Sequence, residues 1–391
     1  MSESASVVRF TRRTQRELTA VDRPLRLPHG EFDGGGARFL GEPVPELLPD
    51  SAAALWAACD GGRAFGSFAP AEAEWIARWH AAGLVVAAPA PRTAPAGSPV
   101  CLSPHPDDAT LAVGALLARS GGRVVNVFSQ ETWTRRPYYR ERPALASRLL
   151  LAEERVACRV LDVRPAFLGH VDAADRAAWG AGFLVEPDAE ASAVAAEPDL
   201  FARVTADLAA EVAGAPLVLV PLGVGGHVDH VLTRQAALAL VHEGVWEPGR
   251  VAFYEDMPYA LFTEAAQAAG RLERPGGLSG AGRSGGGARP VRVPGSEETA
   301  LAKQEALWAY RLQVLDAVVR RIDRYGRKAG DDGTAAGVAD AADAAHSVSP
   351  VGFAERLWVW PEAEAAVREL AADRGDSNGR GGDGPSATTG D

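Results

Sequence analysis

The chain has 391 residues, of which 47% are hydrophobic, and its formal net charge at pH 7 is −11. This length allows one large domain or a few smaller ones, and scattered basic residues argue against a nucleic-acid surface. Its three cysteines form no CxxC pair, which argues against a thiolate metal site and a disulfide framework. There is no apolar signal region and no stretch of membrane-spanning length, so we expect a cytoplasmic protein without a membrane partner.

The first 98 residues predict a tail, a small module and a linker. Residues 1–40 are rich in Arg, Pro and Gly, which predicts a flexible tail with short strands near 7–10 and 37–40. Residues 41–88 predict a small helical module, and the Pro/Ala-rich residues 89–98 predict a linker. The elements expected in the module are, in order, a helix over 51–59, an Asp-Gly turn at 60–63, a helix from Pro70 and a strand over 84–87.

From Pro99 onward, apolar strands alternate with amphipathic helices. Strands that are apolar throughout predict a Rossmann-like, three-layer α/β fold, in which a mostly parallel sheet is covered on both faces. The expected strands are 99–103, 123–129, 164–168, 216–221 and 250–254. The expected helices between them are 108–119, 143–160, 200–212 and 227–242.

The C-terminal part is less regular, but it completes an expected domain over 99–370. Gly-rich stretches at 273–297 and 328–350 predict loose loops, and residues 298–327 between them predict a helix. Residues 353–370 predict a strand at 357–360 followed by a short helix. Residues 371–391 have almost no apolar side chains and predict a disordered tail.

Two clusters of His and Asp follow two of the expected strands. They are Ser103-Pro104-His105-Pro106-Asp107-Asp108 and His227-Val228-Asp229-His230. A single His at a strand end is usually structural, and an Asp at a helix start is usually a cap. Ligands of parallel α/β sheets bind beyond the carboxyl ends of the strands, so the presence of both clusters there favours one functional site.

The spacing within each cluster suits a metal. If Pro106 begins a helix, His105 and Asp108 lie three residues apart at its mouth and can face one point. One imidazole and one carboxylate are two thirds of a His₂-carboxylate set, which suits zinc (Zn2+) or another divalent metal. His227 and His230 are also three residues apart, so both can reach the same site.

The remaining polar groups suit proton transfer. A metal hydrolase needs a base for the attacking water and an acid for the leaving group. Asp107 lies beside a ligand and is the candidate base. His227 is the candidate acid and can also stabilise the tetrahedral intermediate, while Asp229 can orient His227 or a ligand histidine.

These two clusters together resemble the PIG-L-like (N-acetylglucosaminyl deacetylase) superfamily, with a match from about residue 99 to 259. The resemblance implies that His105, Asp108 and His230 bind zinc. It implies Asp107 as the general base and His227 as the general acid or electrostatic stabiliser. The implied reaction is hydrolysis of an N-acyl amide, usually an acetamido group on a sugar.

Shorter matches support this resemblance, and three positions depart from it. The supporting pieces are Glu153 in the long helix, Leu168-Gly169-x-x-Asp172, Tyr254-Glu255-Asp256-x-Pro258-Tyr259, and Lys303 with Ala309-Tyr310-x-x-Gln313. The family usually has Glu where this chain has Ala109, and often Arg where it has Leu150. Some members have a carbonyl-polarising Tyr where this chain has Gly225, so that role would pass to zinc, His227 or a loop residue.

The loop over 129–142 is expected to form a substrate wall. The aromatic face of Trp133 suits a sugar ring, and Arg135 suits a phosphate or carboxylate; Asp172 is a third candidate substrate residue. We therefore expect a zinc-dependent N-deacetylase acting on an amino-sugar conjugate or related small metabolite. The alternatives are an amidase for larger N-acyl or thiol-conjugate amides, and a degenerate enzyme that serves as a binding scaffold.

Residues 41–88 also resemble, more weakly, the PqqD-like winged-helix modules, which bind peptides. This resemblance implies a peptide or carrier partner at the N-terminal module. A plain helical cap on the main domain explains the same residues.

Overall fold

A seven-stranded sheet forms the centre of the part of the chain that the structure describes. The computed structural model describes residues 16–32, 37–44, 49–93, 97–179, 182–272, 287–335 and 352–372. The strands stand in the order β11-β12-β10-β9-β6-β7-β8. Their bounds are β6 Val100–Ser103, β7 Arg123–Asn126, β8 Arg164–Phe167, β9 Val218–Pro221, β10 Val251–Tyr254, β11 Arg289–Gly295 and β12 Phe353–Val359.

The five strands predicted from the apolar runs are parallel, and the chain reverses direction across the sheet at β6. From β6 it moves outward through β7 to β8, then returns to β9 on the other side of β6 and continues to β10. Right-handed crossovers therefore place the helices after β6 and β7 on one face and the helix after β9 on the other. The α/β prediction is confirmed, and the β6–β9 boundary is the point where such sheets bind ligands.

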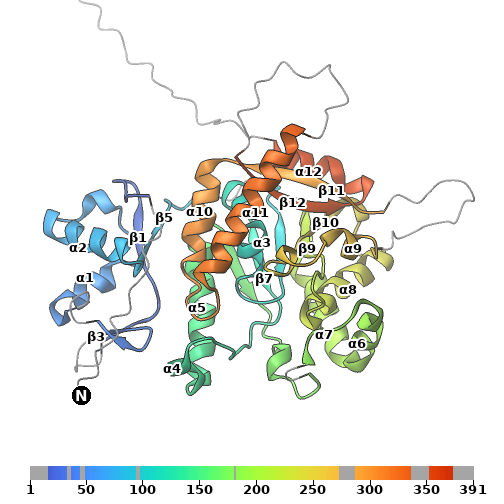
Figure 1. The fold of residues 1–391 in the computed structure, drawn as a ribbon, viewed down its shortest axis with the longest axis horizontal. Helices are drawn as coiled ribbons and strands as arrows, with labels where there is room; N and C mark the ends of the chain where they lie inside the picture. Colours follow the sequence, from blue (N-terminus) through green and yellow to red (C-terminus); the bar gives the residue numbers. More distant parts are fainter. Residues whose placement is uncertain are drawn as a thin grey trace, which may run out of the picture.

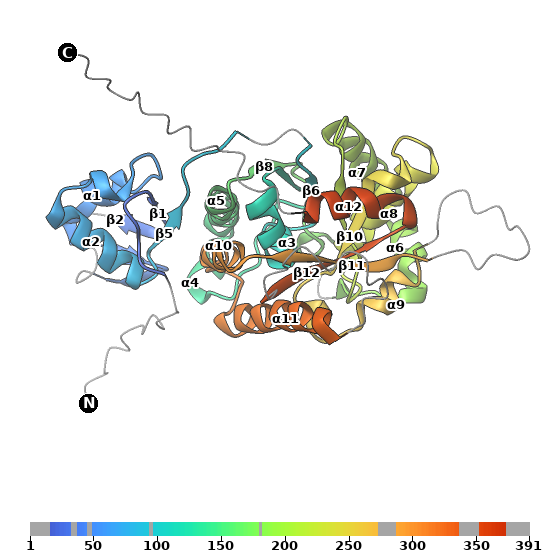
Figure 2. The same cartoon turned by 90° about the horizontal axis from the view of Figure 1, so that it is seen from above.

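Helices cover both faces, as the two views of Figures 1 and 2 show. On one face α3 (Asp108–Ser120), α5 (Pro143–Leu161) and α10 (Glu297–Leu307) pack against one another. On the other, α8 (Val228–His242) packs on β9 and on α7 (Pro198–Glu211). None of the helices in the described ranges has the length and apolar character needed to cross a membrane. The shorter helices are α4 Pro137–Arg140, α6 Glu190–Ala196, α9 Ala265–Ala269 and α12 Glu364–Ala371.

Two antiparallel strands at one edge correct the loop predicted over 273–297. Strand β11 occupies the end of that segment and pairs with β12, which pairs with β10. The sequence of this segment predicts a loop because it contains Pro290 and Pro294. Both prolines nevertheless lie within β11, where the side chains of Val291 and Val293 are buried in the core. Proline is tolerated in an edge strand, where one row of backbone groups needs no partner. Residues 273–286 lie outside the described ranges.

The helix predicted over 298–327 is two helices. Helix α10 ends at Leu307, and α11 spans Asp316–Ala335. The intervening residues turn because the Glu153 carboxylate accepts hydrogen bonds from the backbone N–H groups of Arg311 and Leu312, at 2.8 and 3.0 Å. Helix α11 also replaces the start of the loop predicted over 328–350, and residues 336–351 lie outside the described ranges, as does the predicted tail from 373.

The N-terminal module begins earlier than predicted. The tail prediction for residues 1–40 is wrong in its described part, because β1 pairs with β5 and a small sheet β2-β3-β4 follows. The short strand expected at 37–40 is present as β3, whereas β1, β2 and β4 are only two to four residues long, too short to show a period in the sequence. The predicted strand at 7–10 lies outside the described residues. The bounds are β1 Arg23–Arg26, β2 Gly30–Phe32, β3 Ala37–Phe39, β4 Glu42–Pro43, α1 Ala53–Ala58, α2 Pro70–Ala81 and β5 Val85–Ala88.

The module is anchored to the main domain by two buried histidines. His29 Nε2 lies 2.7 Å from Glu153 Oε1, and both side chains are fully buried. His80 Nε2 lies 3.0 Å from Glu305 Oε1, which also accepts the backbone N–H of Ala87. In Figure 2 the module lies beside α5 and α10.

Candidate active site

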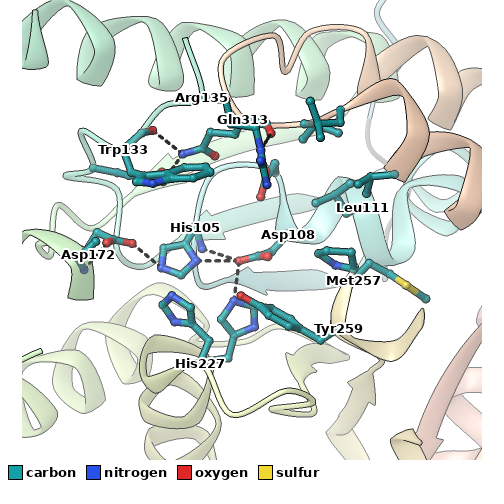
Figure 3. Close-up of a pocket in the computed structure, with 18 of the residues that line it drawn as sticks. His105, Asp108, Leu111, Trp133, Arg135, Asp172, His227, Met257, Tyr259 and Gln313 are labelled. Atoms are coloured by element: carbon teal, nitrogen blue, oxygen red, sulfur yellow. Dashed lines mark hydrogen bonds and ion pairs between the residues drawn. The ribbon is translucent and has the colours of Figure 1, made fainter. Parts of the chain in front are cut away.

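A cavity of about 310 Å³ opens beyond the carboxyl ends of β6 and β9 (Figure 3). Both His/Asp clusters reach it, as the sheet topology requires. The lining residues used below are His105, Asp107, Asp108, Glu131, Trp133, Arg135, Asp172, His227, His230, Tyr259 and Gln313.

The first cluster is shaped by Ser103 at the end of β6. Its hydroxyl donates to the His105 carbonyl at 2.6 Å and accepts the backbone N–H of Ala109 at 3.0 Å. Asp107, just before α3, has a φ of 114°, a conformation that is uncommon for a non-glycine residue. This turn aims Asp107 and Asp108 into the cavity. Ala109, which departs from the family pattern, is buried and needs no polar partner.

The second cluster depends on a glycine that allows close backbone contact. Gly226 has a φ of 72°, and a Cβ there would lie 2.1 Å from the Val185 carbonyl oxygen. Its own carbonyl accepts the N–H of Val185 at 2.8 Å, and His227 forms a β-bridge with Leu184. The segment ahead of α8 is thereby fixed, so that His227 and His230 both face the cavity.

Three of the predicted ligand side chains surround one point. Asp108 Oδ2 lies 3.2 Å from His105 Nδ1 and 3.2 Å from His230 Nε2. Donor atoms of a tetrahedral site with bonds of about 2.0 Å lie about 3.3 Å apart, and the two distances to Asp108 match this spacing. His227 lies close by, since the described residues include a group in which His105, His227 and His230 offer atoms within 4.8 Å of one another.

A second group of this kind, His105 with Asp172, His227 and Asp229, fits a metal less well. Asp229 Oδ1 lies 2.7 Å from Arg176 Nη1, and Asp229 Oδ2 accepts the N–H of Ala173. Asp229 already has a cationic partner and a backbone donor. Asp229 therefore serves as a hydrogen-bond partner better than as a ligand.

Carboxylates behind the ligand histidines fix their orientation. Asp256 Oδ1 lies 2.6 Å from His230 Nδ1, which turns His230 Nε2 toward Asp108. Asp172 Oδ2 and Asp229 Oδ2 lie 2.8 and 3.0 Å from His105 Nε2, which turns its Nδ1 to the same point. Such carboxylate–histidine pairs are the usual support of a metal-bound imidazole. Asp229 thus contacts His105, a predicted ligand, and its role in orienting a ligand histidine stays a prediction.

These contacts determine the pKa values of the three predicted ligands. Burial alone would lower the pKa of His230, but Asp108 and Asp256 outweigh it and raise that pKa to about 9. Burial is likewise outweighed at His105, whose pKa is raised well above its usual value by Asp172 and Asp108. The pKa of Asp108 is lowered because its two histidine partners overcome the effect of burial. The site is therefore built to hold positive charge beside Asp108.

The two predicted proton-transfer residues have opposite environments. Burial, with the nearby charges of Asp108 and Glu131, raises the pKa of Asp107 well above its usual value. Burial and the neighbouring His105 and His230 lower the pKa of His227 to about 3. The backbone N–H of Asp229 donates to His227 Nδ1 at 3.2 Å, which leaves Nε2 as the proton-bearing nitrogen of a neutral ring.

The predicted substrate residues Trp133, Arg135 and Asp172 all line the cavity. In Figure 3, Trp133 and Gln313 lie on one side of His105, and His227 and Tyr259 lie on the other. The side chain of Trp133 is 46% exposed, so its face is available to a ligand.

Three residues at the site were not assigned a role from the sequence: Glu131 and Tyr259, which line the cavity, and Asp256, which lies behind His230. Asp256 and Tyr259 belong to a supporting motif, but only the fold shows that Asp256 contacts His230 and that Tyr259 lines the cavity. The ring of Tyr259 also occupies the space above Gly225, where an added Cβ would lie 2.6 Å from it. The glycine that departs from the family pattern therefore makes room for this tyrosine.

Comparisons with known proteins found a matching family and a similar deacetylase. The family described as PIG-L, GlcNAc-PI de-N-acetylase, matches residues 100–241. A 2'-N-acetylparomamine deacetylase of Streptomyces fradiae is 30% identical over 281 residues, which are 70% of this chain and 92% of that protein.

Solved structures of deacetylases were also matched. The A40926 pseudoaglycone deacetylase is 22% identical, with a TM-score of 0.45, over 68% of this chain and 97% of its own. A deacetylase of teicoplanin biosynthesis is 22% identical, with a TM-score of 0.47, over 67% of this chain and 96% of its own. Because the chain spans nearly all of the Streptomyces fradiae deacetylase at 30% identity and carries the matching family region, it belongs to the PIG-L family of metal-dependent N-deacetylases.

Proposed function

We propose that this protein is a zinc-dependent N-deacetylase that converts an N-acetylated amino sugar, or a related small metabolite, to the free amine and acetate. The observation that carries the proposal is the His105–Asp108–His230 donor set, which shares one cavity with Asp107 and His227. The Streptomyces fradiae relative is named for an N-acetylated amino sugar, which supports this substrate class.

His105, Asp108 and His230 would hold the metal, with Asp172, Asp229 and Asp256 behind them. A divalent metal bound there lowers the pKa of water toward 7 and polarises the acetamide carbonyl. Zinc is our choice because the set combines two imidazoles with one carboxylate and leaves a position open.

Asp107 is proposed to move the proton. The oxygen of water attacks the carbonyl carbon, and the Asp107 carboxylate accepts the proton that this water loses. When the C–N bond breaks, Asp107 returns that proton to the departing nitrogen, which leaves as the amine. A raised pKa suits both steps, because an acid–base group works best when its pKa lies near the working pH.

His227 and Tyr259 are proposed to stabilise the oxyanion. His227 presents Nε2–H to the cavity because its Nδ1 already accepts a backbone N–H. Tyr259 lines the same cavity, and its ring packs edge-on against His230 with centroids 5.7 Å apart. Two preorganised donors at a developing negative charge give strong transition-state stabilisation in a water-poor site. Tyr259 thus takes the polarising role that Gly225 cannot have.

The test is metal analysis of the purified protein together with acetate release from a panel of N-acetylated amino sugars. We expect one metal ion per chain, and loss of both metal and activity in His105→Ala. His242→Ala, at the exposed end of α8, is the matched control and should retain both. A full-length protein that binds no stoichiometric metal and releases no acetate would contradict the proposal and favour the scaffold alternative.

A further inference from the structure

Glu131 has no part in the chemistry proposed above, although its carboxylate reaches the same cavity. Its side chain is only 6% exposed, and it lines the cavity together with Asp107 and Asp108. Its Oε2 atom is buried and, among the described residues, has no hydrogen-bond partner. Leaving a buried carboxylate oxygen without a donor is costly, so a ligand that supplies one would be favoured.

The backbone around Glu131 is held rigidly by the sheet. The preceding residue, Gln130, forms a parallel β-bridge with Val171, four residues beyond the last β7–β8 pair, Asn126 with Phe167. Gln130 N–H donates to the His170 carbonyl at 3.0 Å, and Asp172 N–H donates to the Gln130 carbonyl at 2.9 Å. The carboxylate therefore projects from an ordered strand extension, close to the residue that supports His105.

Gln313 fixes the Glu131 side chain from the other side. Its Nε2 donates to Glu131 Oε1 and, at 2.9 Å, to the Trp133 carbonyl. Two more hydrogen bonds join the 129–142 loop to the segment around Gln313. Thr134 Oγ1 donates to the Leu312 carbonyl at 3.0 Å, and Arg135 Nε donates to the Gln313 carbonyl at 3.0 Å. One oxygen of Glu131 is thus bonded to Gln313, and the other is buried without a hydrogen-bond partner among the described residues.

The charges in the cavity leave Glu131 without a positive partner. Asp108 faces His105 and His230, and Asp172 faces His105. Among the described residues Glu131 forms no ion pair with a side chain within 4 Å, and Arg135, the arginine in the lining, directs its Nε to a carbonyl. An ionised carboxylate buried without a counter-charge is unfavourable, and a cation on the ligand removes that penalty.

We propose that Glu131 binds an ammonium group of the substrate, so that the enzyme selects N-acetylated amino sugars that carry a second, free amine. This inference rests on the proposed deacetylase function and specifies its substrate class. A hydroxyl group could supply the missing hydrogen bond but not the missing charge.

The electrostatics of Glu131 agree with this assignment. Burial raises the pKa of Glu131 to about 8, an effect that His105 opposes and Asp172 reinforces. An ammonium group at Oε2 would stabilise its ionised form, so binding of such a substrate would release a proton.

The experiment compares two substrates in wild-type protein and in Glu131→Gln. One is a mono-N-acetylated pseudodisaccharide with a free amine, and the other is the same compound with that amine replaced by a hydroxyl. We expect wild type to prefer the amine. Glu131→Gln should lower kcat/KM for the amine about 10- to 100-fold, mainly through KM, and should change the hydroxyl analogue less than about threefold.

The glutamine variant is close to isosteric and can still accept the Gln313 hydrogen bond through its amide oxygen. Its turnover of the hydroxyl analogue, in the same preparation, shows that the fold and the catalytic groups are intact. Glu131→Asp, which keeps the charge on a shorter side chain, should retain part of the preference for the amine.

Two results would overturn the inference: equal losses on both substrates in Glu131→Gln, or no loss on either. The first would make Glu131 a positioning residue for the wall, and the second would make it dispensable. Failure of the proposed function looks different, because wild type would then hydrolyse neither compound and carry no metal. Proton release measured on mixing the amine substrate with metal-loaded Asp107→Asn should also be absent when Glu131→Gln is added to that variant.

Discussion

At the scale of single residues, the neighbouring carboxylates of Asp107 and Asp108 have different surroundings. Asp108 lies beside the imidazoles of His105 and His230, which lower its pKa. Asp107, the preceding residue in the chain, is buried near other carboxylates, and this raises its pKa. A pair of titratable groups driven apart in this way is the usual sign of divided acid–base function.

This division predicts that Asp107→Asn retains the metal and loses turnover. Asparagine tolerates a positive φ better than most residues, so the turn at 114° should survive. We expect kcat to fall about 10²- to 10⁴-fold, the usual contribution of general acid–base catalysis. Stopped-time acetate assays with metal analysis of the same sample test this, and loss of metal in the variant would show that Asp107 is a ligand instead.

A second residue-scale prediction concerns Asp256, which the sequence did not single out as a metal-site residue. Asp256→Asn weakens the charged contact to His230 Nδ1, so that His230 Nε2 is a poorer and less oriented donor. We expect metal affinity to fall about 10- to 100-fold, measured by competition with a chelator. Glu255→Gln, which changes a buried carboxylate that contacts Tyr325, Arg356 and Trp358 instead, is the control and should leave metal affinity unchanged.

The site was predictable where a chemically distinctive cluster of side chains directly follows a recognisable strand in the sequence. His105 and His230 stand in short clusters directly after apolar strands, so strand order alone brings them together. Glu131 follows a strand too, but it stands alone in a loop, and its unpartnered oxygen appears only when Gln313 packs against it. Tyr259 was quoted only as part of a motif, because its place above Gly225 depends on contacts between segments far apart in the chain.

At the scale of elements, helix α3 is broken at Val113, whose φ and ψ are −124° and 26°. The break frees backbone groups that two buried side chains satisfy. Lys303 Nζ donates to the Ala112 carbonyl at 3.1 Å, and Glu355 accepts the N–H groups of Ala115 and Leu116 at 3.0 and 2.8 Å. Lys303 and Glu355 also pair with each other at 2.7 Å, so α10 and β12 together support the helix that carries Asp108.

The element-scale prediction is that Lys303→Ala destabilises the domain by about 3–5 kcal/mol, because it leaves the Glu355 charge buried and unpaired. Urea unfolding followed by tryptophan fluorescence measures this change. The double variant Lys303→Met with Glu355→Gln removes both charges and should recover part of the loss. If Lys303→Ala unfolds at the same urea concentration as wild type, the pair has no role in holding the broken helix.

At the scale of the whole molecule, the N-terminal module supports the cavity from behind. His29 of the module contacts Glu153 Oε1, and that oxygen also accepts the backbone N–H groups of Arg311 and Leu312. The next residue, Gln313, is part of the cavity wall. A chain of direct contacts therefore runs from the module to the substrate wall. A peptide or carrier partner of this module stays a prediction, and the same is true of its likeness to PqqD-like domains.

The module's supporting role predicts that His29→Ala raises KM about 3- to 10-fold and leaves kcat and metal content near wild type. The reason is geometric: without the His29 ring, Glu153 loses a donor and the turn at 311–313 gains freedom, while the ligand set is untouched. His80→Ala is the control, because it breaks the same interface at Glu305, on α10 rather than at that turn. Deleting residues 1–95 is a poorer test, since it uncovers buried surface on α5 and α10 and would confuse misfolding with loss of support. Equal changes in KM for His29→Ala and His80→Ala would mean that the module acts on the cavity only through overall stability.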